Sequence, residues 1–318
     1  MEFPASGIDG GEGLRMQDAA LTAIDDLHRT GTDVRIVYLA GASPVQNPHQ
    51  DEGSDNDADV AAGSAEVAAL AAKGVHVVVG PLRSNVGRAE EPALARAHSV
   101  AISGPATGPS DIGSRVFKLA PSDRQLAGAA LAWMRARYGG RVCVLDDGTA
   151  KAREQAEAFL SIDSSARHAT LGGRVAECAL RADAVYATAL AADPVFCSAR
   201  TARRAGVSAL VQAMALRGFD PAAFAGAGSL WRAQPAPIAR TAAVAAVAAR
   251  YHARAFVAAT DSALRFYAAT QIAVAAARLA GDPRPVLSSR PFATILGTVR
   301  FSDRGEIRAP AIVVRRVN

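Results

Sequence analysis

The sequence predicts an α/β protein built from two domains. Short apolar runs alternate along it with helical patterns, which is the order expected of parallel sheets covered by helices. Two successive apolar runs also end abruptly in Gly, Pro and a hydroxyl residue, as buried parallel strands do where they open into loops. The chain has 318 residues, 50% of them hydrophobic. It is therefore long enough to bury a core in each of two domains.

The first part of the chain gives a β-α-β-α-β succession. Apolar residues keep helical spacing over 14–28, and Gly74 ends the second expected helix. This succession implies a parallel sheet with right-handed crossovers. The expected elements are helix 14–28, strand 34–39, helix 61–72, strand 75–79, helix 86–98 and strand 100–103.

A second α/β succession follows. Ser122 is the expected N-cap of a helix that runs from Asp123 to the Gly139-Gly140 pair. Two long Ala-rich helices come next without a strand between them, and two strands connected through the turn 302–305 close the chain. The expected elements after that first helix are strand 141–145, helix 150–160, strand 184–189, helix 194–205, strand 208–214, helices 238–258 and 262–280, and strands 297–301 and 311–315.

Two hydroxyl residues follow neighbouring strand ends. Strand 75–79 leads through Gly-Pro to Ser84, and strand 100–103 leads through Gly-Pro to Thr107. The carboxyl ends of parallel strands meet at one edge of a sheet, and open α/β sheets bind ligands there. We therefore expect both hydroxyls and several free backbone N–H groups to lie together at this edge.

Composition excludes several classes of function. The net charge is +5 and the pI is near 9.4, but the basic residues are scattered and aromatics make up only 5%. This pattern argues against nucleic-acid binding. The six His and three Cys are dispersed, and the chain has no phosphate-binding loop or nucleophile elbow. We expect no metal, no cofactor and no catalytic residue.

The cysteines and the N-terminal residues provide evidence about the cellular compartment in which the protein works. Cys143 lies in an expected strand and is expected to be core, whereas a bridge between Cys178 and Cys197 is conceivable in an oxidising compartment. No stretch is long and apolar enough to span a bilayer, and residues 1–7 lack the features of a signal peptide.

An ordered series of motifs resembles one family. The chain is similar over nearly its whole length to the type I periplasmic binding proteins of the branched-chain amino acid (Leu/Ile/Val-binding) class, the solute-binding subunits of ABC importers. The segments that carry the resemblance are Gly80-Pro81-Leu82-Arg83-Ser84, Ser103-Gly104-Pro105-Ala106-Thr107, residues 116–123, 146–150, 266–271 and 297–305.

The resemblance implies an architecture and a role. Each of two lobes is a parallel sheet flanked by helices, and three hinge crossings join them. Lobe 1, which binds the ligand carboxylate, comprises 1–119 and 245–295; the closing lobe 2 comprises 120–244 and 296–318. Such a protein is a periplasmic or extracytoplasmic monomer and not an enzyme. It captures a small carboxylated solute in the interlobe cleft and presents it to the membrane subunits of an ABC permease.

The resemblance also assigns ligand-binding residues in lobe 1. By position, Ser84 and Thr107 would donate to the carboxylate, and the Pro105 carbonyl would accept from an ammonium group. Asn85 and Ala106 lie beside them in the same loops. The alternative for each residue is an ordinary helix cap or turn.

In lobe 2 the chain departs from the family. No acid occurs in 212–216, where amino-acid-binding members place a carboxylate, so an ammonium group would be buried without a full partner. Asp147, or its neighbour Asp146, could replace that acid, and Lys151 could face a second acidic group on the ligand. The alternative is that these are solvent-facing charges. A dicarboxylate, an amide or an aromatic acid therefore remains open as the solute.

The N-terminus departs as well. Residues 2–7 resemble the family's first loop, but the buried strand that precedes this loop is missing, which would leave a gap in the first sheet. Truncation and a degenerate relative are the two explanations. A second functional interpretation follows: a ligand sensor or partner-binding regulator of the same fold, such as a cell-wall synthase activator, without a transport role.

Overall fold

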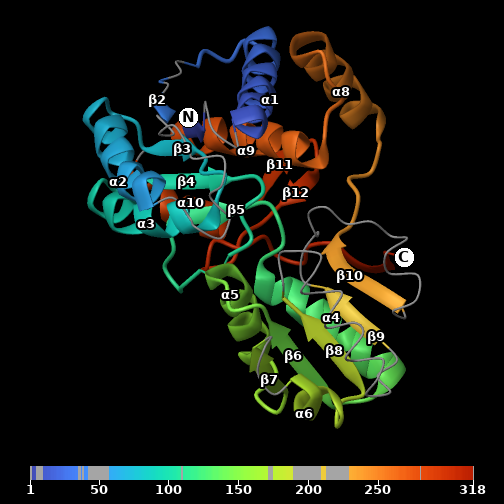
Figure 1. The fold of residues 1–318 in the computed structure, drawn as a ribbon. Helices are drawn as coiled ribbons and strands as arrows, with labels where there is room; N and C mark the ends of the chain where they lie inside the picture. The colour runs from blue at the N-terminus through green and yellow to red at the C-terminus, as the bar shows by residue number, and fades with distance from the viewer. Residues whose placement is uncertain are drawn as a thin grey trace. The chain divides into compact units, whose positions relative to one another are not determined.

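The protein divides into two compact units (Figure 1). Unit 1 holds Met1–Ala120 and Pro237–Ala309, and unit 2 holds Pro121–Ala236 and Pro310–Asn318, so the chain passes between them after Ala120, after Ala236 and after Ala309. This computed structural model describes residues 2–4, 10–34, 37, 39–41, 57–108, 110–170, 175–188, 209–212, 229–279 and 281–317.

The boundaries of the units differ from those expected from the sequence, which were 119/120, 244/245 and 295/296. Residues beyond 295 stay with unit 1 because Val299 and Phe301 are buried in its core. The backbone N–H of Lys118 also donates to the carbonyl of Gly305 at 2.8 Å. The second crossing lies earlier than expected because the helix that follows it begins at Ala242 and packs in unit 1.

Unit 1 is built on a three-stranded parallel sheet in the order β3-β4-β5. A separate parallel pair, β1-β2, and an antiparallel hairpin, β11-β12, complete its strands among the described residues. The elements are β1 (Glu2–Pro4), α1 (Gly10–Arg29), β2 (Leu39–Gly41), α2 (Asp57–Ala72), β3 (Val77–Val79), α3 (Ser84–Arg96), β4 (Val100–Ser103), β5 (Val116–Lys118), α8 (Ala242–Ala255), α9 (Asp261–Ala277), α10 (Pro283–Ser289), β11 (Phe292–Thr294) and β12 (Gly297–Val299).

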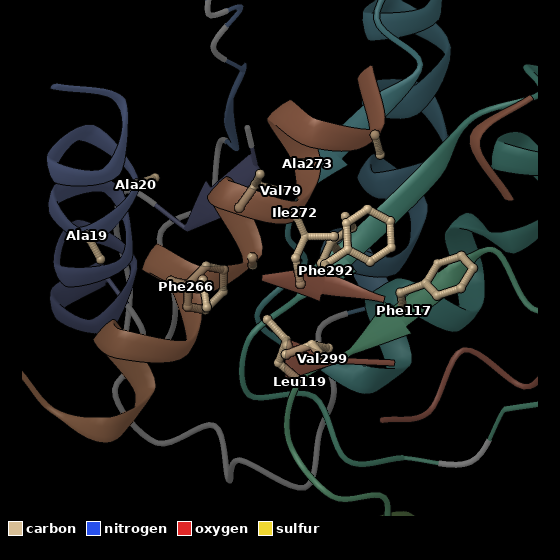
Figure 2. Close-up of a cluster of buried hydrophobic side chains, with 14 of the residues drawn as sticks. Ala19, Ala20, Val79, Phe117, Leu119, Phe266, Ile272, Ala273, Phe292 and Val299 are labelled. Atoms are coloured by element: carbon tan, nitrogen blue, oxygen red, sulfur yellow. The ribbon is translucent and has the colours of Figure 1, made fainter. Parts of the chain in front are cut away.

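The core of unit 1 forms around α9. Figure 2 shows side chains from α1, α9, the sheet and the β11-β12 hairpin meeting in one cluster. Phe117 and Phe266 are fully buried in it. Alanines such as Ala268 and Ala269 are fully buried as well, and their small side chains let helix backbones approach closely. This packing fixes the sheet edge at which β3 and β4 end.

Unit 2 is built on a six-stranded sheet in the order β13-β10-β9-β8-β6-β7, in which β13 alone runs antiparallel. Its first helix begins with a capping box: Ser122 Oγ accepts from the N–H of Gln125, whose side chain accepts from the N–H of Ser122. The elements are α4 (Asp123–Tyr138), β6 (Val142–Asp146), α5 (Ala150–Leu160), β7 (Arg167–Thr170), α6 (Val175–Ala179), β8 (Ala184–Ala187), β9 (Ala209–Gln212), β10 (Ser229–Pro235) and β13 (Ile312–Arg316).

The two strands expected at the C-terminus are present, and the turn after the first places Phe301 opposite Ile307 in an antiparallel bridge. Strand β12 pairs with β11 in unit 1, whereas β13 pairs with β10 in unit 2. The chain crosses between the units after Ala309, within the segment that was expected to join the two strands. The sequence pattern found two strands here but gave no partner for either.

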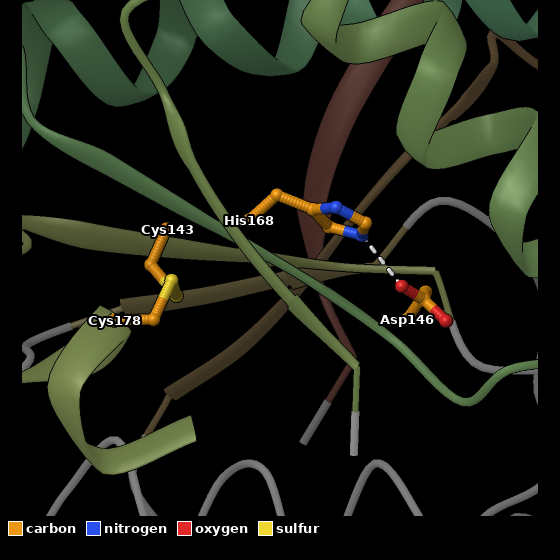
Figure 3. Close-up of a disulfide and its surroundings, with 4 residues drawn as sticks. All are labelled: Cys143, Asp146, His168 and Cys178. Carbon is orange, nitrogen blue, oxygen red and sulfur yellow. Dashed lines mark hydrogen bonds and ion pairs between the residues drawn. A yellow bond between two sulfur atoms is a disulfide. The ribbon is translucent and has the colours of Figure 1, made fainter. Parts of the chain in front are cut away.

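The cysteine pairing also differs from the expectation. Cys143 on β6 forms a disulfide with Cys178 on α6, with the two Cα atoms 5.5 Å apart (Figure 3). Cys178 is therefore not available to Cys197, which lies outside the described residues. Both bonded cysteines are buried, so Cys143 is a core residue as expected but not a thiol.

Two further observations complete the fold. Within the described ranges, no helix combines the length and apolar character needed to cross a bilayer. The expected helix 194–205 lies outside the described residues, as do positions 35, 36 and 38 of the expected strand 34–39.

Candidate functional site

The hydroxyl of Ser84 joins the two strand-end loops of unit 1. Ser84 is the first residue of α3, directly after the β3 loop, and Thr107 lies in the loop after β4. The Oγ atom of Ser84 accepts from the backbone N–H of Thr107 at 3.1 Å and from that of Gly108 at 2.8 Å. The structure therefore brings together the two residues that the sequence singled out.

Two neighbouring residues explain why the loops approach so closely. A Cβ atom on Gly108 would lie 2.5 Å from the Cβ of Ser84, so only glycine fits at this position. Ser103, at the end of β4, donates from Oγ to the Pro81 carbonyl at 2.8 Å and accepts from the N–H of Ala106 at 3.1 Å. The β3 and β4 loops are thus held to each other by two serine side chains.

These hydrogen bonds correct the expectation of free backbone N–H groups and define the role left to the Ser84 hydroxyl. The backbone N–H groups of Ala106, Thr107 and Gly108 are not free for a ligand, because serine oxygens accept from all three. A hydroxyl has two acceptor positions and one donor hydrogen. Since Ser84 uses both acceptor positions on the loop, its hydrogen is directed away from that backbone, and no acceptor for it is found among the described residues.

The other lobe 1 candidates lie in the same loops. Asn85 is half-buried beside Ser84, and its Nδ2 is buried without a hydrogen-bond partner among the described residues. Pro105 and Thr107 are half-buried, and Ala106 is buried. The amide of Asn85 is therefore a second donor at this edge.

In unit 2, the structure accounts for Asp147 and Lys151 by local partners. Asp147 Oδ1 accepts from the N–H of Thr149 at 3.1 Å and from its hydroxyl at 2.7 Å, which shapes the turn into α5. Lys151 Nζ donates to Asp123 Oδ2 at 2.6 Å and lies 3.7 Å from Glu154 Oε2. Asp123 is 3% exposed, so this ion pair is largely buried and ties α5 to the start of α4. The sequence did not predict this ion pair.

Asp146, the neighbour of Asp147, is fully buried at the end of β6. Its carboxylate accepts from the N–H of Gly148 at 2.6 Å and from Thr170 Oγ1 at 3.1 Å, and it lies 2.5 Å from His168 Nε2 (Figure 3). Asp146 is therefore fully engaged within unit 2.

Tyr186 on β8 is a core residue. It is 1% exposed, and its ring lies 4.5 Å from that of Phe159, centroid to centroid. Burial, and to a lesser degree the nearby carboxylate of Asp123, raises the pKa of the Tyr186 hydroxyl above its usual value of 10. The hydroxyl therefore stays neutral at physiological pH.

Sequence reasoning missed one polar residue at the unit 1 edge. Lys118 ends β5 and is 3% exposed, with Nζ donating to the carbonyl of Gly108 at 2.6 Å. The resemblance places this lysine in a hinge strand and assigns it no role. The available signal was its rarity: the chain holds 35 basic residues, and Lys118 is one of only three that are lysine.

Solved structures show what this architecture is. A substrate-binding protein of an ABC transporter from Desulfitobacterium hafniense, in complex with Leu, superposes with a TM-score of 0.68 at 16% identity and covers 95% of this chain and 93% of its own. The branched-chain amino acid binding protein LivJ from Streptococcus pneumoniae, in complex with isoleucine, gives 0.60 at 16% identity, with 99% and 98% covered. The chain has the type I periplasmic binding protein fold.

A third structure of this fold binds a different acid. A solute-binding protein of an ABC transporter from R. palustris, in complex with 4-hydroxybenzoate, superposes with a TM-score of 0.68 at 15% identity, covering 100% of this chain and 91% of its own. No protein-family model matches the sequence, and no curated protein does. The likeness to type I periplasmic binding proteins therefore rests on structure, and it confirms the predicted two-lobed α/β fold.

Proposed function

We propose that this protein is a non-enzymatic, extracytoplasmic solute-binding protein. It captures a small carboxylated solute, whose carboxylate is held by unit 1, and delivers it to the membrane subunits of an ABC permease. The observation that carries the proposal is that the Ser84 hydroxyl accepts hydrogen bonds from two backbone N–H groups. Only its own hydrogen then remains for a hydrogen bond to a ligand.

The position of Ser84 suits an anion. A hydroxyl that accepts two hydrogen bonds becomes a stronger donor, since linked hydrogen bonds polarise one another. Ser84 also begins α3, a helix of 13 residues, and the first N–H groups and the dipole of a helix favour negative charge at its N-terminus. Asn85 Nδ2 adds a second donor without a described partner. Thr107 and the Pro105 carbonyl complete the set proposed for this edge.

The ligands of the compared structures support the class of solute. The three proteins described above bind leucine, isoleucine and 4-hydroxybenzoate, and each compound has one carboxylate. The remainder of these molecules differs in charge and shape. A carboxylate is therefore the feature that we carry over to this chain.

Three acids of unit 2 near the starts of α4 and α5 favour a solute without an ammonium group. Asp123 pairs with Lys151, Asp146 accepts from Gly148, Thr170 and His168, and Asp147 accepts from Thr149. An ammonium group that used one of these three carboxylates would have to take it from its present partners, at a cost in desolvation and lost hydrogen bonds. We expect an aromatic acid or a dicarboxylate to bind better than leucine.

The disulfide supports the proposed location. Disulfides persist in oxidising compartments and are rare in the cytosol of most organisms. The Cys143–Cys178 bond joins two buried residues of unit 2 and so belongs to the folded structure. This fits a protein that works outside the cytoplasm.

A thermal-shift screen tests the proposal. The compounds are benzoate, 4-hydroxybenzoate, succinate and leucine, with benzamide as the uncharged analogue of benzoate. A ligand that binds only the folded state adds about 2.7 kcal/mol of stability at a hundredfold excess over its Kd. We expect at least one carboxylate to raise Tm, benzamide to have little effect, and Ser84→Ala to abolish the shift.

Ser64→Ala is the matched control. Ser64 also lies in unit 1 and donates to a backbone carbonyl, that of Ala89 at 2.9 Å, but it is on α2. Its variant should keep the full ligand response. If no compound shifts the folded wild-type protein, the solute-binding proposal is overturned and a partner-binding regulator of the same fold becomes the better explanation.

A further inference from the structure

Lys118 is a buried lysine at the edge where we place the carboxylate. It is the last residue of β5, and only 3% of it is exposed. Its backbone is fixed on both sides: β5 pairs with β4, and the N–H of Lys118 donates to the Gly305 carbonyl at 2.8 Å. The start of its side chain is therefore held by the sheet and not by a mobile loop.

The ammonium group of Lys118 binds the loop that carries Thr107. Nζ donates to the carbonyl of Gly108 at 2.6 Å and also to Ser110 Oγ. In the β4-β5 register, Ser103 lies opposite Lys118, and Ser103 Oγ accepts from the N–H of Ala106 in the same loop. Two residues that are partners in the sheet thus bind successive parts of one loop.

Three side chains together fix the backbone of residues 106–108. Ser103 accepts from the N–H of Ala106, Ser84 accepts from those of Thr107 and Gly108, and Lys118 donates to the Gly108 carbonyl. Gly108 is therefore bound on both its N–H and its C=O. Its N–H donates to the Ser84 hydroxyl, which we propose binds the ligand carboxylate, and its C=O accepts from the ammonium group of Lys118.

A cation is an expensive way to hold a loop. Burying an ammonium group costs far more than burying a neutral side chain of similar length, such as Met, unless hydrogen bonds and charge interactions offset the loss of water. An anion bound at Ser84, across one peptide unit from Gly108, would interact favourably with that charge. A lysine at this position can therefore both hold the loop and attract a negatively charged ligand.

We propose that Lys118 is a positioning residue of the carboxylate site in unit 1: it holds residues 106–108 so that Ser84 keeps both acceptor positions occupied and its hydrogen directed at the ligand. This inference rests on the function proposed above. It adds that affinity for the carboxylate depends on a residue whose ammonium group binds the loop.

The first test measures affinity by titration calorimetry, with whichever of benzoate, 4-hydroxybenzoate, succinate and leucine gives the largest thermal shift. We expect Lys118→Met to weaken binding about tenfold, as removal of one nearby charge and its hydrogen bonds predicts. Lys118→Arg, which keeps a cation and several donors, should lose less. Lys73→Met removes an exposed lysine of unit 1 and should leave Kd unchanged within about twofold.

The second test needs no ligand. Hydrogen exchange at the amides of Ala106, Thr107 and Gly108 reports on whether the serines still accept from them. In Lys118→Met these amides should exchange faster, while those of α9, in the core of unit 1, should keep their wild-type rates. A purely structural lysine would instead accelerate exchange throughout the unit.

The outcomes separate this inference from the proposed function. If wild-type protein binds a carboxylate and Lys118→Met binds it equally well, the positioning role is overturned while the solute-binding function stands. Unchanged exchange at residues 106–108 would overturn it as well. If wild-type protein binds none of the compounds, the proposed function fails and the role of Lys118 in it fails too, and the exchange experiment then decides only whether Lys118 holds the loop.

Discussion

Two buried tyrosines of unit 1 differ in whether the hydroxyl has a hydrogen-bond partner. Tyr267 on α9 is 4% exposed and donates to Asp26 Oδ2 at 2.5 Å. Tyr251 on α8 is 2% exposed, and its hydroxyl has no hydrogen-bond partner among the described residues. A buried polar group without a partner costs about 1–3 kcal/mol, whereas a hydrogen bond to a charged group contributes about 1.5–3 kcal/mol.

Removal of each hydroxyl should therefore have opposite effects. We expect Tyr251→Phe to leave the free energy of unfolding unchanged or to raise it by up to about 1 kcal/mol, and Tyr267→Phe to lower it by about 2 kcal/mol. Urea unfolding of both variants in parallel measures this. A loss of stability in Tyr251→Phe as large as that in Tyr267→Phe would show that the Tyr251 hydroxyl does have a partner.

The loss of folding stability at alkaline pH gives a second test for Tyr251. Burial raises the pKa of its hydroxyl to about 12, above the usual value of 10. Because the folded-state pKa is raised, this contribution to stability is complete below pH 10 and is lost as pH rises from 10 to 12. Tyr251→Phe should lose less stability over that interval than wild type does.

At the scale of single residues, the sequence predicted which unit 1 candidates lie together, but not the local partners of the unit 2 candidates. Ser84 and Thr107 could be found because each follows a strand end, and parallel strands end at the same edge. Lys151 could not be interpreted, because its partner Asp123 is 28 residues away and is brought to it only by the packing of α4 against α5. Local pattern carries no information about such a pair.

At the scale of helices and strands, the disulfide that joins β6 to α6 stabilises unit 2. It closes a loop with a sequence separation of 35 residues. In the chain-entropy account, a crosslink over a loop of that length destabilises the unfolded state by about 4 kcal/mol. Replacing both cysteines by Ala, in a Cys197→Ala background to prevent exchange, should lower the free energy of unfolding of unit 2 by about 3–4 kcal/mol.

Tryptophan fluorescence can measure this loss in unit 2 alone. The chain has two tryptophans, Trp133 on α4 and Trp231 on β10, and their rings lie 4.7 Å apart, centroid to centroid, in unit 2. A reducing agent should shift the transition of the Cys197→Ala protein and leave the triple variant unchanged. If reduction leaves the Cys197→Ala transition unmoved, the two cysteines are not bonded in the folded protein.

A cavity along the outer edge of β3 offers a test of the sheet in unit 1. It has a volume of about 260 Å³ and is lined mainly by apolar side chains, including Val34, Val37, Val77 and Val79. Among described strands β3 pairs with β4 alone. Strand β1 begins opposite Leu39, and Val37, two residues earlier in the partner segment, lines the cavity, so we expect a strand added ahead of β1 to reach it.

An added apolar strand should therefore stabilise unit 1. We expect a chain lengthened by Ile-Val-Ile-Val ahead of Met1 to gain about 2 kcal/mol, because the burial of these side chains exceeds the cost of ordering them. A Gly-Ser-Gly-Ser extension of equal length is the control and should change nothing. Equal Tm values for the two proteins would mean that the cavity does not accept a strand.

Elements with a strong apolar pattern were predicted well, and those without one were not. The central strands β4, β6 and β8 are buried at every position, and each was expected. Strand β7 was missed because its side chains are largely exposed and polar, so no periodicity marks it. Strand β13 was found but its partner β10 was not, since the choice of partner depends on the crossing between units and not on the local sequence.

For the whole molecule, the proposed function requires that one solute affect both units. The residues assigned to the carboxylate, from Ser84 to Thr107, belong to unit 1, whereas both tryptophans belong to unit 2. Fluorescence therefore reports on the unit to which we have assigned no carboxylate-binding residue. A solute held by unit 1 alone would leave the transition measured by fluorescence where it is.

We expect the binding carboxylate to raise the fluorescence-detected Tm of unit 2 as well as the Tm measured by far-UV circular dichroism. A ligand stabilises only those parts of a protein with which its binding is thermodynamically coupled. Ser84→Ala should remove both shifts together, although Ser84 is not in unit 2. A shift confined to the circular dichroism signal would mean that unit 1 binds the carboxylate by itself, and the closing role assigned to unit 2 would then have to be given up.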